Sequence, residues 1–416
     1  MPPPNSNPPP RDVRMRGFSR RSTVEDAWNW IDQQSIHVPA EALDTVSAGG
    51  RVLATDVTSP VNVPAFDRAM MDGFAVQADD TLGATPYNGL PLEVIGQALP
   101  AQPIGDIVKR GQAVRIMTGA PMPDGANAVL QVEQANISED QVEALDAVTP
   151  GKHVGKVGED IAQGSVVLRS GRRLRPQDIG ILASIGVAKV SVFRRVRVRV
   201  LVTGNELLPP GSKPEGFQIV DSNSPMLRGL VGRDGGDVTC SEIVADDPRE
   251  ILAALKDDVD VILVSGGSSV GQEDYAPRLL AEHGELAIHG VAMRPSSPSG
   301  MGRLGERLVF LLPGNPVSCL CAYDFFAGRA IRALAGLPTE WPYRSRHLPL
   351  ARKLVSMVGR VDYARVDVVD DRVEPMAVSG ASMLSSTTRA AGFVIVPADS
   401  EGYAPETPVE VFFYDR

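Results

Sequence analysis

Near its beginning the chain carries the pattern of a short amphipathic helix. Thr23 is a suitable N-cap, and Glu25 and Asp26 fall in the first turn, where acidic side chains suit the positive end of the helix dipole. The apolar residues between Ala27 and Ile31, two of them tryptophans, supply a stripe for packing. We therefore expect a helix from about residue 23.

Between residues 50 and 170 the pattern changes to short β-type runs. Segments such as QAVRIMTGAPMP and ANAVLQVEQ are rich in apolar residues and are bounded by Gly or Pro. The chain contains 40 glycines and 34 prolines, which favours tight turns over long helical bundles. The sequence predicts a β-rich N-terminal region of hairpins and small barrels, with residues 21–190 as its bounds.

The middle of the chain alternates apolar strands with helices. The runs at 196–202, 259–264 and 308–312 each end in a polar, Gly-containing turn, and a helix follows the turn. This rhythm predicts a doubly wound α/β domain with a parallel sheet, over residues 195–335. In such sheets ligands bind at the carboxyl ends of the strands.

The two ends of the chain differ from this middle part. Residues 345–416 return to short strands and predict a small C-terminal β-domain. Residues 1–20 begin with MPPPNSNPPPR, a Pro-rich segment that has too little apolar surface to form a core. We expect a disordered tail there, and we favour this over a ligand for an aromatic groove. The fold class is therefore α/β and multidomain.

Charge and cysteine content exclude several classes of protein. The formal net charge of -10 disfavours nucleic-acid binding, although a local basic cluster could still hold a small anion. Three cysteines form no disulfide framework and suit a reducing compartment. Cys319 and Cys321 lie in an apolar run and are interpreted as core residues rather than as a soft-metal pair. With neither an apolar run of about 18 residues nor a signal peptide, we expect a cytoplasmic protein without a membrane span.

Three strand-end loops are candidates for ligand binding. The loop SGGSSVG at 265–271 can offer consecutive backbone N–H groups to a phosphate, and Asp274 follows it. It matches neither common nucleotide-binding fingerprint. The loop PGNPVS at 313–318 is interpreted as a ligand loop, with a rigid strand-to-helix turn as the less favoured alternative. Residues 221–224 contain more polar groups than a helix cap needs.

Acidic residues in turns are the other candidates. Asp72, Asp160, Glu206 and Asp247 are each more often caps or turn residues, but gathered by folding they would form an oxygen site for Mg²⁺. Histidine is scarce and no HExxH motif is present, which disfavours a zinc hydrolase. The sequence also lacks a GxSxG motif for covalent catalysis.

A longer motif carries a family resemblance. The segment RIMTGAPMPDGANAV at 115–129 resembles a signature of the molybdopterin molybdenumtransferase family, which includes MoeA and the gephyrin E-domain. Further motifs of that family stand around it in the expected order: MDGFAV at 71–76, GEDI at 158–161, TGNEL at 203–207, DSNS at 221–224, SGGSSVG with DY at 265–275, and PGNPVS at 313–318. The similarity runs from about residue 20 to the C-terminus.

The resemblance implies a fold and an activity. It implies an elongated homodimer with four regions per subunit, of which the N-terminal region supplies two subdomains, a linker and dimer contacts. The doubly wound domain would be similar to molybdopterin adenylyltransferases, and the C-terminal domain would be a small β-barrel. Members of the family insert molybdenum from molybdate into adenylylated molybdopterin and release AMP, with Mg²⁺, in the final step of molybdenum cofactor biosynthesis. Their active site lies between the doubly wound domain of one subunit and the N-terminal region of the other.

The resemblance also assigns roles to residues of this sequence. The implied catalytic residues are acidic: Asp72, Asp160, Glu206, Asp247 and Asp274. Two of these, Glu206 and Asp274, are the expected metal ligands. The implied substrate-binding residues come from the motif loops: Thr118, Gly119, Asp221, Ser222, Asn223, Gly266, Gly267, Ser269, Arg294, Ser297, Pro313, Gly314, Asn315 and Pro316.

Three departures from the family pattern stand out. Asn205 replaces the aspartate of STGDEL, and residues 68–75 (RAMMDGFA) lose a hydroxyl and an amide found in NSAMDGYA. The lysine loop KPGKP reads RPSSP at 294–298, so that one lysine becomes Arg294 and the other Ser297. Arginine still binds oxyanions, as a fork rather than a point charge.

Because of these departures, a function other than enzymatic activity remains an alternative. A catalytically weakened, gephyrin-like scaffold that binds a partner peptide would keep the fold and lose turnover. Pathway proteins, such as a molybdopterin adenylyltransferase and molybdoenzymes, are possible partners under either hypothesis. An isolated adenylyltransferase is disfavoured, because that class lacks the motifs outside 195–335.

Overall fold

The structure, a computed structural model, describes residues 21–34, 37–267, 274–376 and 382–414. The expected Pro-rich tail at 1–20 lies outside the described residues. The chain divides into two compact units, one of residues 42–191 and the other of residues 1–41 together with 192–416. The strands β1 (Ala40–Asp44) and β12 (Lys189–Phe193) pair where the chain passes from one unit to the other.

The unit of residues 42–191 is built on a six-stranded sheet in the order β7-β4-β6-β5-β9-β8. Its strands are β4 (Gly73–Val76), β5 (Leu90–Ala98), β6 (Gln112–Ile116), β7 (Ala128–Gln131), β8 (Ala135–Ile137) and β9 (Gln141–Ala144). Successive residues of β4 face opposite sides, so that Phe74 and Val76 enter one apolar cluster and Ala75 enters another. The prediction of a β-rich region is confirmed, with one parallel pair, β5 and β6, among antiparallel neighbours.

Smaller elements complete this unit. They are β2 (Val57–Thr58) paired with β11 (Val166–Leu168), β3 (Arg68–Ala69) paired with β10 (Val154–Gly155), and helix α2 (Pro176–Ser184). Asp178 in the first turn of α2 accepts hydrogen bonds from the Arg175 backbone N–H and from the guanidinium groups of Arg172 and Arg175. This carboxylate therefore fixes the beginning of the helix.

The other unit contains the predicted doubly wound domain. Its sheet has the order β16-β13-β17-β21-β20-β18, with strands β13 (Val196–Thr203), β16 (Gly236–Val244), β17 (Val261–Ser265), β18 (Glu285–His289), β20 (Gly300–Leu304) and β21 (Arg307–Leu312). The first four strands in the sheet order are parallel, and β20 and β18 add an antiparallel edge. The fold prediction is confirmed, and the antiparallel edge is a feature that the strand-helix rhythm did not reveal.

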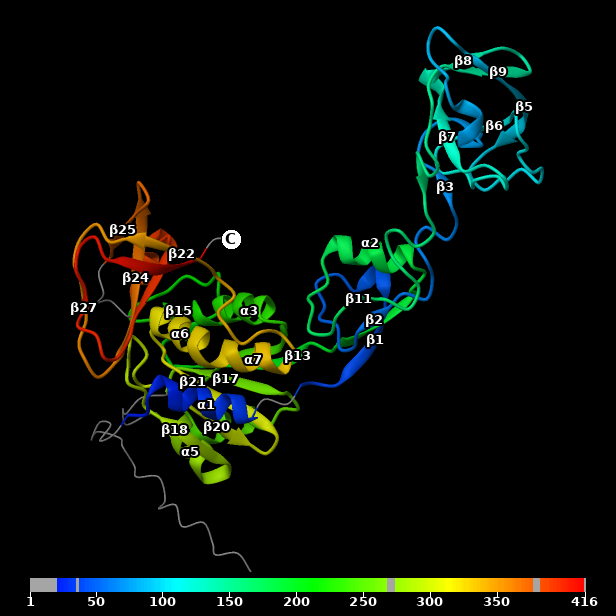
Figure 1. Ribbon diagram of the computed structural model, residues 1–416. Helices are drawn as coiled ribbons and strands as arrows, with labels where there is room; N and C mark the ends of the chain where they lie inside the picture. The colour runs from blue at the N-terminus through cyan, green and yellow to red at the C-terminus, as the bar shows by residue number, and fades with distance from the viewer. Residues whose placement is uncertain (1–20, 35–36, 268–273, 377–381, 415–416) are drawn as a thin grey trace, which may run out of the picture. The chain divides into compact units, whose positions relative to one another are not determined.

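Helices cover both faces of this sheet (Figure 1). They are α3 (Asn223–Arg233), α4 (Pro248–Ala254), α5 (Ala276–His283), α6 (Pro316–Ala322), a π-helical turn η4 (Tyr323–Ala327) and α7 (Gly328–Leu334). One apolar cluster joins α3, α6, η4 and α7 to one face, and a second joins α4 and α5 to the other. Alternate residues of β13 supply the two clusters, since Val200 belongs to the first and Leu201 to the second.

Helix α1 (Val24–Gln34), which falls within the predicted N-terminal region of 21–190, packs with this unit. Its buried residues Val24, Ala27 and Ile31 join the cluster formed by α6, η4 and α7. Trp28 Nε1 donates a hydrogen bond to Phe325 O at 2.8 Å. The amphipathic pattern was interpreted correctly as a helix, but a pattern of this kind does not say which domain covers its apolar face.

The C-terminal β-domain belongs to the same unit. Its main sheet has the order β19-β24-β26-β28-β22, with β25 beside β24. The elements are β19 (Met293–Arg294), β22 (Arg344–Pro349), β23 (Leu354–Val355), β24 (Val361–Val369), β25 (Arg372–Pro375), α8 (Ser385–Arg389), β26 (Gly392–Val396), β27 (Gly402–Tyr403) and β28 (Pro408–Phe413). Strand β19 comes from the doubly wound domain and pairs with β24, so the two domains share a sheet. No helix in the described part of the chain is long and apolar enough to span a membrane.

Candidate active site

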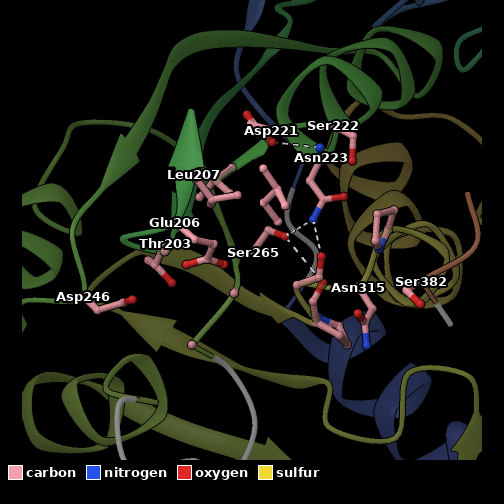
Figure 2. A pocket seen from close by; sticks show the side chains of 18 of the residues that line it. Thr203, Glu206, Leu207, Asp221, Ser222, Asn223, Asp246, Ser265, Asn315 and Ser382 are labelled. Carbon is pink, nitrogen blue, oxygen red and sulfur yellow. Dashed lines mark hydrogen bonds between the residues drawn. The ribbon is translucent and has the colours of Figure 1, made fainter. Parts of the chain in front are cut away.

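A cavity of about 640 Å³ opens at the carboxyl ends of β13, β17 and β21 (Figure 2). It is formed by the strand-end loops, by the short strands β14 (Leu207–Leu208) and β15 (Ile219–Val220), and by one residue of the C-terminal domain, Ser382. Of the residues predicted for the site, it gathers Glu206, Asp221, Ser222, Asn223, Gly266, Gly267, Asp274, Pro313, Gly314, Asn315 and Pro316. We call this cavity the strand-end pocket.

Hydrogen bonds from Asn223 hold three of these loops together. Its Nδ2 donates to Ser265 Oγ at 2.9 Å and to Gly314 O at 2.8 Å, as Figure 2 shows. Asp221 Oδ1 accepts from the backbone N–H groups of Asn223 at 2.8 Å and Ser224 at 3.1 Å, and thereby stabilises the beginning of α3. The polar run at 221–224 therefore serves both as a cap and as a wall of the strand-end pocket.

The loop after β17 requires glycine at its first position. Gly266 has φ +95°, and a Cβ there would lie 2.5 Å from Thr203 O. Any side chain would both strain the backbone and collide with the end of β13. Gly266 thus lets two strand-end loops approach each other. Ser269, which we expected to bind substrate, lies outside the described residues.

Three oxygen atoms in the pocket wall are buried without a hydrogen-bond partner among the described residues. They are Thr203 Oγ1, Asp221 Oδ2 and Asn223 Oδ1. Their residues are 6%, 4% and 5% exposed, respectively. Burying a polar atom without a partner is costly, so these atoms set the strand-end pocket apart from an ordinary turn cluster.

Besides Asp221, three carboxylates line the strand-end pocket: Glu206, Asp246 and Asp274. Asp246 was not among the predicted residues. It exchanges two hydrogen bonds with Asn205, since Asn205 N donates to Asp246 Oδ2 at 3.3 Å and Asp246 N donates to Asn205 Oδ1 at 3.2 Å. Asn205, the residue that replaces the aspartate of the family motif, therefore links the ends of β13 and β16.

The neighbouring Asp247, which we expected to be catalytic, is not among the residues that line this pocket. Its Oδ1 accepts from the backbone N–H groups of Arg249 at 2.8 Å and Glu250 at 3.2 Å, and so caps α4. Pro248 occupies the first turn of that helix, which favours a cap at the residue before it. This signal was available in the sequence and would have directed attention to Asp246.

Arg294 and Ser297 do not line the strand-end pocket either, although Pro298 does. Arg294 Nη2 donates to Asp362 of β24, a residue that is 1% exposed and that also accepts from Arg360 Nε at 3.1 Å and Ser356 Oγ at 2.8 Å. Ser297 is half-buried. Arg294 thus connects the loop beside the pocket to the C-terminal domain.

The remaining predicted residues belong to the unit of residues 42–191. Asp72 Oδ1 accepts from Thr118 N at 2.7 Å and from Thr118 Oγ1 at 2.8 Å. These hydrogen bonds hold the pKa of Asp72 below its usual value. Gly119 N donates to Ala69 O at 2.8 Å, and the exposed Asp160 donates its backbone N–H to Val63 O at 3.1 Å. Asp72 and Thr118, which are far apart in the sequence, thus form one exposed polar pair.

A second cavity, of about 620 Å³, is lined by residues at the opposite ends of the strands, including Arg197 and Leu308. Two ion pairs occur among the charged side chains that line it: Arg194 Nη1 lies 2.6 Å from Asp260, and Arg197 Nη1 lies 3.1 Å from Asp258.

Burial raises the pKa of Cys319 to about 12, so its thiol stays protonated and is a poor metal ligand. Within the described ranges no three His, Cys, Asp or Glu side chains are grouped so as to hold a metal ion.

Comparison with known proteins gives three consecutive matches to family models. Residues 22–186 match the MoeA N-terminal region (domain I and II), residues 199–333 a probable molybdopterin binding domain, and residues 347–414 the MoeA C-terminal region (domain IV). Together they account for nearly the whole described chain.

Similar proteins extend over the same length. A molybdopterin molybdenumtransferase 2 of Mycobacterium tuberculosis is 36% identical over 386 residues, which are 88% of this chain and 93% of that protein. A putative molybdopterin biosynthesis protein of Methanocaldococcus jannaschii is 34% identical and covers 89% of this chain and 91% of its own length. The solved structure of the molybdopterin biosynthesis MoeA protein from Pyrococcus horikoshii has a TM-score of 0.83 at 30% identity, covering 95% of this chain and 100% of that one.

Proposed function

Because this chain belongs to the MoeA family of molybdopterin biosynthesis proteins, we propose that it is a molybdopterin molybdenumtransferase, an enzyme that inserts molybdenum into molybdopterin. The observation that carries this proposal is the strand-end pocket, which lies in the region matched by the molybdopterin binding domain and gathers eleven of the residues predicted for the site. Relatives named as this transferase are 32% to 36% identical to this chain over the aligned residues.

The proposed substrates are adenylylated molybdopterin and molybdate, and the proposed products are metal-loaded cofactor and AMP. Release of AMP requires cleavage of a P–O bond in the phosphoanhydride and a positioned attacking oxygen. Glu206, Asp246 and Asp274 line the same pocket and can accept protons from a water molecule held there. The backbone of Gly266 and Gly267 can approach the phosphate closely, as the positive φ angles of both glycines support.

The pocket suits Mg²⁺ as the charge-neutralising ion. Mg²⁺ is usually bound by one or two carboxylates together with substrate phosphates and water, rather than by a complete protein cage. Glu206 and Asp274, which both line the pocket, would hold it. When bound, the ion would reduce the negative charge on the phosphate oxygens.

Arg294 remains a proposed contact for the molybdate oxyanion. Arg294 and Arg360 both donate to Asp362, so two guanidinium charges share one carboxylate. Their side chains are 33% and 28% exposed. The resulting excess of positive charge would attract an oxyanion to the loop that leads into Pro298. We expect Arg294→Ala to raise the KM for molybdate more than it lowers kcat.

The residues of the other unit and the oligomeric state complete the proposal. We propose that the chain acts as a homodimer in the cytoplasm and that Asp72, Thr118, Gly119 and Asp160 contribute to the reaction, as the family motifs imply. Exposed carboxylates with lowered pKa, such as Asp72, stay ionised at neutral pH and are suited to bind cations or to orient water. A gephyrin-like scaffold is not favoured, because the curated relatives are named as transferases and the site residues are gathered in one pocket.

The experiment that tests the function is molybdate-dependent release of AMP from adenylylated molybdopterin by the purified, full-length protein. We expect release by the wild type, dependence on molybdate, and a loss of about 100-fold or more for Asp274→Ala. A well-folded wild type that releases no AMP at saturating molybdate would contradict the proposal, and so would an Asp274→Ala variant as active as the wild type.

A further inference from the structure

The loop of residues 294–298, which stands in place of the family's KPGKP, contains a backbone conformation that serine rarely adopts. Ser296 has φ +84°, in the left-handed region that glycine enters easily, and the family pattern has glycine at this position. A residue other than glycine keeps such a conformation only where its surroundings stabilise it, and residues of this kind gather at functional sites. The contacts of Ser296 identify what stabilises it here.

The side chain of Ser296 contacts the helix that follows the PGNP segment. Its Oγ donates a hydrogen bond of 2.6 Å to Ser318 O, in the first turn of α6, and the two residues are 3% and 4% exposed. A carbonyl oxygen can only accept, so the direction of this hydrogen bond is fixed. A buried hydroxyl that loses its partner is costly, and the hydrogen bond therefore holds Ser296 in its unfavourable backbone conformation.

This contact joins two walls of the strand-end pocket. Pro298, two residues after Ser296, lines the pocket on one side. Residues 313–316, which come just before Ser318, line it on another. The hydrogen bond between the two serines therefore fixes how these walls lie relative to each other.

Other hydrogen bonds hold the two ends of the loop. Arg294 donates to Asp362 of the C-terminal domain at the beginning of the loop. Val291 N donates to Ser297 O at 2.8 Å, and Ser299 N donates to Ser296 O at 3.0 Å. To these contacts the hydroxyl of Ser296 adds a connection to α6 that glycine could not make.

We propose that Ser296 is a positioning residue for the oxyanion substrate: its hydroxyl holds the loop of residues 294–298 against α6, so that Arg294 is in place before molybdate binds. This inference rests on the proposed function, in which Arg294 contacts molybdate. A loop that is ordered in advance loses less conformational freedom on binding and therefore binds more tightly. The loop has one cation fewer than the family pattern, and its order offsets part of that loss.

The test compares two substitutions of Ser296 in the full-length protein. Ser296→Gly removes the hydroxyl but also removes the cost of the positive φ, so its free energy of unfolding should stay close to that of the wild type. Ser296→Ala removes only the hydroxyl and should be less stable. Both are expected to raise the KM for molybdate in AMP release by about fivefold or more and to leave kcat within about twofold. An unchanged KM in either variant would overturn the proposal.

Ser299→Ala is the matched control, because Ser299 directly follows the loop and is 1% exposed. Its Oγ donates to Ser296 O at 2.7 Å, and its backbone N–H donates to the same oxygen and remains when the hydroxyl is removed. We expect the KM of this variant for molybdate to stay within about twofold of the wild type. A rise as large as that of Ser296→Ala would mean that loss of any buried hydroxyl here has this effect, and the role of Ser296 would be contradicted.

Two measurements that need no turnover separate this inference from the proposed function. The dissociation constant of molybdate, measured by calorimetry, should rise about fivefold or more in Ser296→Gly. The backbone amides of Val291 and Ser299, which donate to the loop, should exchange their hydrogens faster in that variant. Both changes in a protein that releases no AMP would support the role of Ser296 and contradict the proposed function. An active wild type whose Ser296→Gly variant shows neither change would overturn this inference alone.

Discussion

Two sets of buried polar side chains in the unit that contains the doubly wound domain differ in how their charges are satisfied. The first, which we call the ion cluster, consists of Arg233, Asp234, Asp324, Arg332 and Tyr343. In it Arg233 donates to Asp234 at 2.8 Å and Asp324 at 2.9 Å, Tyr343 donates to Asp324 at 2.9 Å, and Arg332 lies 3.1 Å from Asp234. The second set lies in the wall of the strand-end pocket and consists of Thr203 Oγ1, Asp221 Oδ2 and Asn223 Oδ1, which have no partner among the described residues.

This difference separates structural from functional polar groups. Both carboxylates of the ion cluster are 0% exposed and both accept hydrogen bonds from Arg233, so their effect is on stability. The wall of the strand-end pocket holds three buried oxygen atoms without a hydrogen-bond partner among the described residues. Substitutions in the first set should therefore change folding, and substitutions in the second should change activity or binding.

The largest expected effect is on the ion cluster. Asp324→Ala leaves Arg233 buried with one partner fewer, and removal of one member of a buried pair costs about 3–5 kcal/mol in the free energy of unfolding. Burial raises the pKa of Asp324 although Arg233 opposes this, so the carboxylate depends on its partner to stay ionised. Urea unfolding would measure the loss, with the exposed Asp258→Ala as a control. If Asp324→Ala had the same free energy of unfolding as the wild type, the ion cluster would not stabilise the fold.

The carboxylates of the strand-end pocket should affect activity rather than stability. Glu206→Gln and Asp274→Asn are expected to lower kcat/KM by about 100-fold, because each removes charge near the proposed reacting phosphate. Their free energy of unfolding should stay within about 0.5 kcal/mol of the wild type. AMP release and urea unfolding on the same preparations would provide the test. Variants that lose both activity and stability together would argue that these carboxylates are structural.

The adjacent residues Asp246 and Asp247 sharpen the comparison. Asp247→Ala removes the cap of α4 and is expected to cost about 1 kcal/mol of stability. Asp246→Ala should instead lower AMP release at nearly unchanged stability, since Asp246 lines the strand-end pocket. If Asp247→Ala impaired turnover in a fully stable protein, the role that the sequence suggested for Asp247 would be right.

The smallest expected effect on stability is that of Asp178, a carboxylate in the unit of residues 42–191. Burial would raise the pKa of Asp178, but the hydrogen bonds from Arg172 and Arg175 outweigh it and hold the pKa well below the usual 3.8. A carboxylate with a lowered pKa stabilises the fold above pH 3.8, and this contribution is lost as the pH falls below that value. Asp178→Asn should cost about 0.5 kcal/mol at pH 7 and flatten the loss of stability below pH 4. Thermal unfolding across pH 2 to 7 would detect this, and an identical pH profile would contradict it.

Much of the fold was predictable because local pattern and tertiary structure agree. The strands β17 and β21 come from nearly continuous apolar runs and are buried on both faces, and the second half of β13, from Val200, is buried in the same way. Since parallel strands end at one edge, the loops after them had to meet, which brought residues 221–224, 265–267 and 313–316 to one pocket.

The rest depended on contacts between distant parts of the sequence. The pairing of Arg294 with Asp362, the packing of α1 beside α7, and the presence of Ser382 in the pocket each join segments that no local pattern relates. The sequence suggested Asp247 over Asp246 by motif alone, and the cap geometry distinguishes them. The three buried oxygens without a hydrogen-bond partner could not be inferred from the sequence, because they depend on which neighbouring atoms already form hydrogen bonds in the fold.

The most direct test of the account is hydrogen exchange of the full-length protein with and without adenylylated molybdopterin. The account predicts slowed exchange of the backbone amides of Thr203, Gly204, Glu206 and Leu207, of residues 221–223, and of Gly314 and Asn315, all of which line the strand-end pocket. Protection confined to residues 256–260 and 303–307, around the second cavity, would contradict it.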